Sequence, residues 1–532
     1  MKKILVLLFV MLYLTGCDVQ EEPEQVLWVV TEKSSADGMN LQAEDVAQQI
    51  EAEYPGWTVR LEILPTESDE REPRLRRLRT EIMSGNGPDV YLLPTGKEIP
   101  NYKGDARETI SIEPLFSDVW QAMYSGVFAD ISQLYDNDDD LGKDALNQNV
   151  MDGVLLDGKR YVLPVRYDVP VVYTRPDLCR QYGLEEDVFE SDLLTMIDAV
   201  LSAGGEAGIG LQLPEDLQAF GQLMDYAKGN VTITTEQIQQ YLSLHQQREA
   251  LFQEQTQSFL NEWEHHRRIF WLLPGHDTSD ILADEAFRST ISYPHIYPKI
   301  EDFDHEWLNS LTMYTAQDLH WSSCDLPLYT GWLADILDTL GVTVLTQQSV
   351  EVYPIQTVDG AVQAKITYFG AVGSSSQHSE VGYAFLQKIL SEEFQWERTR
   401  PRSNKGGAFW TWEKETQGQC LLECSLPVRT NGCVPDLWDN LRYRTKLSYF
   451  SNIASTVKRC SLIQQTFLTD ADVPQLFWQI DRVYFPVNLP QEQEFCTYIE
   501  QIQENVTTLT ETDLANFAQE IYQNLWWHLA EG

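Results

Sequence analysis

The first hundred residues alternate strand and helix patterns, and this alternation restricts the fold more than any other feature. The apolar run Val26–Val30 predicts a strand, and apolar residues at helical spacing within Ala43–Ile50 predict a helix that buries one face. Thr58–Leu64 alternates as a half-buried strand, Leu75–Ile82 has a second helical stripe, and Asp89–Leu93 is a third strand. This order predicts parallel strands with right-handed crossovers, which is an α/β fold.

That topology also predicts where a ligand binds. In open α/β sheets, ligands bind beyond the carboxyl ends of the strands. The segments expected there are 31–40, 65–70 and the residues from 94 onward, and they carry hydroxyls and carboxylates that suit a polar solute: Thr31, Glu32, Ser34, Thr66, Glu67 and Thr95. Surface loops are generally polar, so each residue taken alone also fits a purely structural role.

The chain leaves the first sheet and later returns to an α/β pattern. Asp177–Trp321 has mainly helical patterns, whereas Val362–Tyr368 alternates as a strand and Val381–Ile389 has an amphipathic helical stripe. A last helix is expected behind Thr512. A departure and return of this kind predicts two lobes joined by several strands, with the first crossing within Tyr161–Tyr173.

Charge and composition exclude several classes of function. The 532 residues include 81 acidic and 38 basic side chains, for a formal net charge of −43. Such a surface repels phosphate backbones and anionic headgroups, so no nucleic-acid partner is expected. A hydrophobic content of 43% provides enough apolar surface for packed cores, and a disordered chain is therefore excluded. We expect a monomer.

The amino terminus has the pattern of an export signal. Lys2 and Lys3 precede an apolar segment, Ile4–Tyr13, which is too short to span a bilayer permanently. Leu-Thr-Gly-Cys follows and resembles a bacterial lipobox. This resemblance implies that Cys17 is acylated, by palmitate among other chains, and holds the protein on the outer face of the cytoplasmic membrane. The alternative is a soluble secreted protein in which Cys17 is incidental.

Six further segments resemble one family in the same order. They are Leu78–Leu93, Gly126–Ser132, Asp157–Pro164, Gly370–Ser376, Glu380–Gln395 and Leu426–Arg429. Together they resemble the bacterial extracellular solute-binding proteins of ABC importers, family 1, the sugar-binding branch. The resemblance implies a two-lobed periplasmic-binding-protein-like fold of type II, in which each lobe is a mixed sheet flanked by helices and a hinge borders an interlobe cleft. It also implies a small-molecule solute of the mono- or oligosaccharide class, and delivery to ABC permease subunits without catalysis.

These inferences give an expected division of the chain. Residues 1–16 are the signal peptide and 17–25 a tether; the first lobe takes 26–165 and 345–400, and the second takes 166–344 and 401–532. Residues 230–345 and the tail beyond 430 match little of the family pattern. The whole chain is also longer than the usual member of the family.

Ten residues are candidates for ligand contact. Sugars are bound by aromatic faces together with carboxylates and hydroxyls, and Tyr167 with Asp168 ranks first because both follow Pro164 at the expected crossing. The full set is Thr31, Glu32, Thr66, Asp89, Tyr91, Tyr167, Asp168, Trp332, Tyr368 and Trp410. Most aromatic residues in a chain of this size belong to the core, so each retains that alternative.

Other motifs do not indicate a metal site. The acidic run Asp136–Asp140 lacks the glycine and glutamate of a calcium loop, and His265 with His266 lacks a zinc motif. The cysteines lack zinc spacing and the pattern of a disulfide framework, and one or two individual bridges stay open as an alternative. No metal and no cofactor are expected. Two rival functions remain. An exported glycoside hydrolase would use paired carboxylates, and a sensor domain would present a ligand to a surface kinase.

Overall fold

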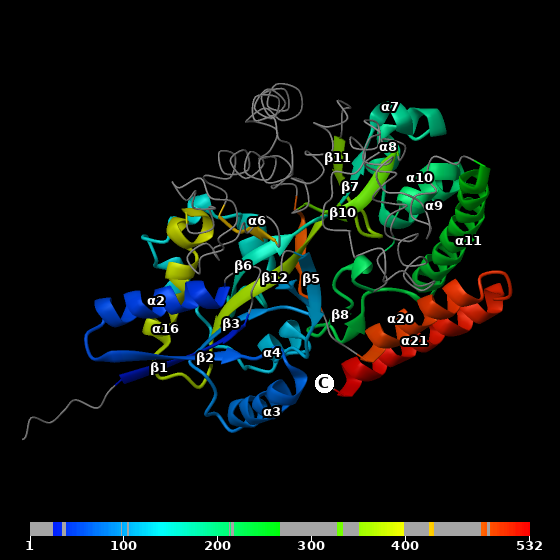
Figure 1. Cartoon of the computed structure of the whole chain (residues 1–532). Coiled ribbons are helices and arrows are strands. Elements are labelled where there is room, and N and C mark those ends of the chain that lie inside the picture. The colour runs from blue at the N-terminus through cyan, green and yellow to red at the C-terminus, as the bar shows by residue number, and fades with distance from the viewer. Residues whose placement is uncertain are drawn as a thin grey trace, which may run out of the picture.

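The chain forms two lobes, each built around its own hydrophobic core. The computed structural model describes residues 25–33, 39–96, 98–103, 106–211, 213, 217–265, 327–333, 351–397, 425–429, 480–486 and 490–531. We call the body built on the larger sheet the first lobe, and the helical body built on the smaller sheet the second lobe. Figure 1 shows the first lobe on the left and the second on the right.

The first lobe contains a mixed sheet with helices on both faces. In order along the sheet, the strands are β13 (Leu426–Pro427), β6 (Val162–Asp168), β12 (Gln363–Val372), β3 (Val90–Pro94), β1 (Gln25–Glu32) and β2 (Trp57–Leu64), and β14 (Arg482–Tyr484) pairs with β12. Its helices are α2 (Met39–Glu53), α3 (Ser68–Met83), α4 (Val119–Tyr124), α5 (Ser132–Asp136), α6 (Gln148–Gly153) and α16 (Ser379–Ile389), and a small hairpin is formed by β4 (Glu98–Lys103) and β5 (Ala106–Ser111).

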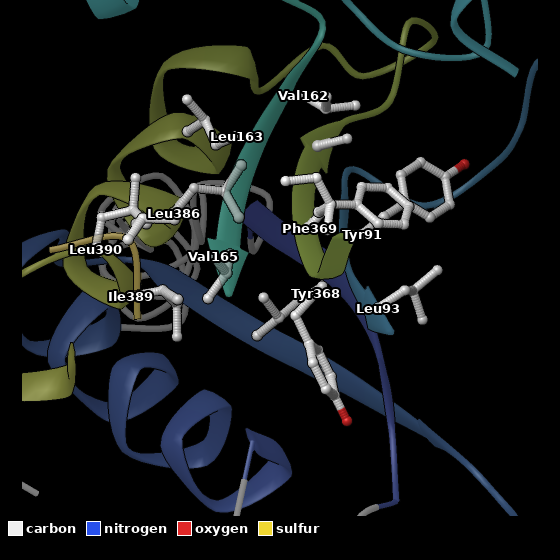
Figure 2. Close-up of a cluster of buried hydrophobic side chains, with 14 of the residues drawn as sticks. Tyr91, Leu93, Val162, Leu163, Val165, Tyr368, Phe369, Leu386, Ile389 and Leu390 are labelled. Atoms are coloured by element: carbon white, nitrogen blue, oxygen red, sulfur yellow. The ribbon is translucent and has the colours of Figure 1, made fainter. Parts of the chain in front are cut away.

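The first three strands of the sheet are parallel, and a later strand inserts beside them. β1 pairs in parallel with both β2 and β3, as predicted. β12 comes from late in the chain and inserts between β3 and β6, antiparallel to both. Helices α2 and α16 contact one another beside the sheet (Figure 1). Figure 2 shows Leu386, Ile389 and Leu390 meeting side chains from the sheet in the core of this lobe.

The second lobe is mainly helical. A small sheet has the order β10 (Leu328–Trp332), β7 (Pro170–Thr174) and β11 (Glu351–Pro354), and β8 (Met224–Asp225) pairs with β9 (Asn230–Val231) as a hairpin. The helices are α7 (Pro176–Cys179), α8 (Glu186–Phe189), α9 (Leu193–Ala203), α10 (Gly205–Gly210), α11 (Thr235–His265), α20 (Pro490–Glu504) and α21 (Glu511–Glu531). Asp192 caps α9 by accepting the backbone N–H groups of Leu194 and Thr195.

The first crossing between the lobes lies where the sequence predicted it. β6 pairs in the first-lobe sheet up to Asp168, and after Val169 the chain enters β7 in the second-lobe sheet. β7 lies between the two cores, because Val171 and Tyr173 pack in the first core whereas Val172 packs in the second. The chain crosses again between β11 and β12 and between β14 and α20.

The observed lobes differ from the expected division at three short strands. β13 and β14 come from residues assigned to the second lobe, yet they pair with β6 and β12 of the first-lobe sheet. β11 was assigned to the first lobe and pairs with β7 instead. Short segments carry little periodicity, so their sheet is decided by the register of a partner strand distant in sequence. The helices α20 and α21 pack in the second core.

Candidate functional site

The carboxyl edge of the first-lobe sheet collects most of the candidate residues. Glu32 ends β1, Thr66 follows β2, and Asp168 ends β6. β12 runs antiparallel, so Tyr368 near its middle pairs with Pro94 at the end of β3. Residues that are hundreds of positions apart in the sequence therefore share one edge, and the chain crosses to the second lobe at this edge.

The pairing of β6 with β12 brings a cluster of polar and aromatic side chains together. Asp168 is the register partner of Lys365, Tyr167 of Ile366, and Arg166 of Tyr368. The Arg166 guanidinium carbon lies 5.5 Å from the centroid of the Tyr368 ring, in cation–π geometry. Tyr368, Tyr167 and Asp168 are all buried.

Trp332 adds an aromatic ring from the second lobe. It ends β10, where it pairs with Pro170 immediately after the crossing. The ammonium nitrogen of Lys365 lies 4.7 Å from the centroid of its ring. Lys365 belongs to the first-lobe sheet, so this cation–π contact joins the two lobes. The Trp332 side chain is half-buried.

Tyr167 and Asp168 are held from both sides. The side-chain amide of Asn147 donates to the Tyr167 hydroxyl at 3.1 Å. One carboxylate oxygen of Asp168 accepts the backbone N–H of Val169 at 2.8 Å. These contacts hold the last two residues of β6 in place. Because β6 ends directly before the crossing, Tyr167 and Asp168 lie at the junction of the lobes.

Glu32 is committed to a buried ion pair. Its two carboxylate oxygens accept from the guanidinium of Arg71 at 2.5 and 2.7 Å, a bidentate arrangement. Arg71 also donates to the carbonyls of Pro65 and Glu113, at 2.8 and 2.7 Å. Both side chains are almost fully buried, with exposures of 1% for Glu32 and 2% for Arg71. The pair therefore ties the end of β1 to the start of α3.

Threonine side chains mark the ends of the three parallel strands. Thr31 is fully buried, and its hydroxyl has no hydrogen-bond partner among the residues that the structure describes. The Thr66 hydroxyl donates to Glu67 at 3.2 Å. Thr95 binds β12 twice: its backbone N–H donates to the Thr367 carbonyl at 2.9 Å, and its hydroxyl donates to the Ile366 carbonyl.

Two candidate residues, Asp89 and Tyr91, lie away from the carboxyl edge of the sheet. Asp89 precedes β3 at its amino end, where its carboxylate accepts the Trp28 backbone N–H at 2.8 Å and the Ser376 hydroxyl at 2.6 Å. Tyr91 is buried against Phe116 and Phe128, and burial raises the pKa of its phenol. Figure 2 shows the Tyr91 and Tyr368 rings pointing away from one another. Both residues lie at the start of the predicted third strand, so the parallel order already places them away from its carboxyl end.

The structure adds Arg166, Lys365 and Arg71 to the candidate residues. Each is a cation at the carboxyl edge of a strongly acidic chain, and Arg166 directly precedes the top-ranked Tyr167. That adjacency was the available sequence signal for Arg166. The contact of Lys365 with Trp332 depends on a pairing between distant segments, so the sequence held no signal for it.

Several sequence predictions fall outside the described residues. Cys17 and Trp410 are among them, as are His266 and most of the cysteines. Within the described ranges, Cys179 is a free thiol and no cluster of metal-binding side chains occurs. The described helices include none with the length and hydropathy of a membrane span.

Comparisons with known proteins return structural likenesses only. No protein-family model and no curated protein sequence matches this chain. Similar solved structures include a protein from Alicyclobacillus acidocaldarius described as extracellular solute-binding protein family 1. It is 11% identical, with 96% of this chain and 99% of that chain covered and a TM-score of 0.44. The sugar-binding protein MalE from Xanthomonas citri is 12% identical (95% and 98% covered, TM-score 0.47).

A third similar structure is an ABC substrate-binding protein of Listeria monocytogenes in complex with cycloalternan, at 13% identity (94% and 98% covered, TM-score 0.41). All three carry descriptions of binding proteins rather than of enzymes.

Proposed function

We propose that this chain is an exported, lipid-anchored solute-binding protein that captures a small carbohydrate between its lobes and delivers it to an ABC importer. The observation that carries the proposal is the junction at Asp168 and Val169. There, two separately packed lobes are joined by crossing strands, and aromatic, cationic and carboxylate side chains from both lobes meet.

The mechanism follows from two rigid lobes and short connections. A solute that contacts Trp332 from the second lobe and the β6–β12 cluster from the first makes all its contacts only when the lobes are close together. The solute therefore favours the closed arrangement by its differential affinity for that arrangement. The half-buried Trp332 ring suits the C–H face of a sugar, and the polar cluster suits its hydroxyls.

The test is a thermal-shift and calorimetric screen against mono- and oligosaccharides, peptides and polyamines. Binding to the folded state alone stabilises the protein by about 2.7 kcal/mol at a hundredfold excess of ligand over Kd. We expect a saccharide to raise Tm and Trp332→Ala to weaken its binding. Trp527→Ala, on the exposed end of α21 in the second lobe, is the matched control. A shift with peptides or polyamines but with no saccharide would overturn the carbohydrate assignment.

The same samples separate binding from catalysis. A labelled oligosaccharide that binds should be recovered intact, in stoichiometric amount, after prolonged incubation. Release of shorter products would favour the glycoside hydrolase instead. Co-purification with a permease rather than with a kinase would distinguish the transport role from the sensor role.

A further inference from the structure

A partly buried hydrogen bond joins the two lobes away from the crossing at Val169. The hydroxyl of Tyr226 donates to the Asp118 carboxylate at 2.5 Å. Asp118 is the N-cap residue of α4, whose side chains Val119 and Met123 pack in the first core. Tyr226 lies in the β8–β9 hairpin, whose Met224 and Val231 pack in the second core. The bond therefore depends on how the two lobes are placed relative to one another.

Asp118 relies on the second lobe for much of its solvation. The side chain is buried, with 3% exposure, and a buried carboxylate is costly unless hydrogen bonds compensate for the lost water. Within its own lobe it accepts the backbone N–H of Gln121 at 3.1 Å. Burial raises the pKa of this carboxyl, and the bond from Tyr226 opposes that rise. His528 on α21 is a further titratable group that interacts with Asp118.

The surrounding surfaces are shaped for close approach. Gly221, in the loop that precedes β8, has a φ of +86°, and a Cβ built there would lie 2.1 Å from the side-chain oxygen of Gln363 on β12. The ring of Tyr124 on α4 lies 6.4 Å from that of Tyr226. In Figure 1, β8 and the carboxyl end of α21 lie beside α4. The second lobe thus touches the first along a seam. Residues 221–226, which include β8, form its second-lobe side, and α4 and the start of β12 form its first-lobe side.

We propose that the Tyr226–Asp118 bond is an interlobe latch that holds the lobes in the observed arrangement and sets how often they separate. A rotation that parts α4 from the hairpin breaks this bond and returns the Asp118 carboxylate to water. Neither residue belongs to the candidate ligand cluster at the β6–β12 edge. The latch therefore controls the lobe equilibrium of the ligand-free protein and does not depend on the identity, or the existence, of a solute.

The chain supplies two matched controls for this bond. The Tyr383 hydroxyl donates to Asp138 at 2.9 Å, and both residues belong to the first lobe. The Tyr353 hydroxyl donates to Glu351 at 2.7 Å, and both belong to the second-lobe sheet. Tyr226→Phe, Tyr383→Phe and Tyr353→Phe each remove one tyrosine–carboxylate hydrogen bond, but only the first removes a bond between the lobes.

The experiment measures lobe separation in the full-length protein without ligand. Small-angle X-ray scattering reports the radius of gyration, and hydrogen exchange reports the protection of α4 and of the β8–β9 hairpin. Loss of a hydrogen bond to a charged group shifts an equilibrium by about tenfold or more. We therefore expect Tyr226→Phe to increase the radius of gyration and to raise exchange about tenfold on both sides of the seam. Tyr383→Phe and Tyr353→Phe should change exchange only within their own lobes.

Asp118→Asn is the second variant. It keeps a side-chain oxygen for the α4 cap and replaces the carboxylate by a neutral amide that bonds the Tyr226 hydroxyl more weakly, so we expect an increase in lobe separation that is smaller than for Tyr226→Phe. The latch is overturned if Tyr226→Phe matches the two controls in scattering, or if its exchange changes stay within the hairpin. It is also overturned if both seam variants unfold by circular dichroism, because the contact would then serve folding rather than lobe placement.

Discussion

The Glu32–Arg71 pair provides a sharp test of how the first lobe is held together. Glu32→Ala would leave the Arg71 guanidinium buried with only the carbonyls of Pro65 and Glu113 as the acceptors described above. Removing one partner of a buried ion pair costs about 3–5 kcal/mol, because the remaining charge is uncompensated. Total stability is typically about 5–15 kcal/mol. We therefore expect Glu32→Ala to remove a large fraction of the stability of the first lobe.

Urea denaturation followed by tryptophan fluorescence and circular dichroism measures this loss. The matched control is Glu72→Ala on α3, the helix that carries Arg71. The Glu72 carboxylate lies 2.6 Å from the Arg76 guanidinium, but the side chains are 63% exposed for Glu72 and 77% exposed for Arg76. Exposed pairs contribute about 0–1 kcal/mol. The double variant Glu32→Leu with Arg71→Met replaces both charges by apolar groups and should be less destabilised than Glu32→Ala alone.

Two results would refute this reasoning. One is a Glu32→Ala variant that loses no more stability than Glu72→Ala. The other is a double variant that loses as much as the two single variants together. Because Arg71 occupies both carboxylate oxygens of Glu32, we also expect Glu32→Ala to affect the free energy of unfolding more than solute affinity.

Three further predictions follow from buried contacts. Gly373→Ala should destabilise the protein by about 1–3 kcal/mol, because its Cβ would lie 2.3 Å from the Pro88 carbonyl oxygen. Gly382→Ala, whose Cβ would lie 3.1 Å from a methyl carbon of Val90, should cost less in the same urea titration because that approach is less close. Thr95→Val should cost about 1–3 kcal/mol, since it leaves the Ile366 carbonyl without its hydroxyl donor; an unchanged denaturation midpoint would contradict this. Burial raises the pKa of Cys179 to about 11, whereas an unfolded thiol titrates near about 8.5; the free energy of unfolding should therefore fall as pH rises between these values, and Cys179→Ala should remove that dependence.

The sequence alone predicted the longest elements of the first lobe and the last helix of the second. Short apolar segments located β1 and β3, alternating apolar residues located β2 and β12, and helical stripes located α2, α3, α16 and, in the second lobe, α21. These segments are long and strongly periodic, so their type follows from which side chains must avoid water. The sequence also predicted a crossing within Tyr161–Tyr173, a segment that Pro164 and Pro170 interrupt.

The tertiary structure decided what those elements do together. Glu32 was a candidate for ligand contact, and the structure shows its carboxylate accepting from Arg71, 39 positions later in the chain. Asp89 and Tyr91 share a strand segment with the expected edge but occupy its other end.

The contact of Lys365 with Trp332 and the bond of Tyr226 to Asp118 join segments on different lobes. Local periodicity reflects only whether a residue faces the core or the solvent. Which distant residue it meets depends on strand register and on the packing of one lobe against the other, and these are set by the whole chain at once.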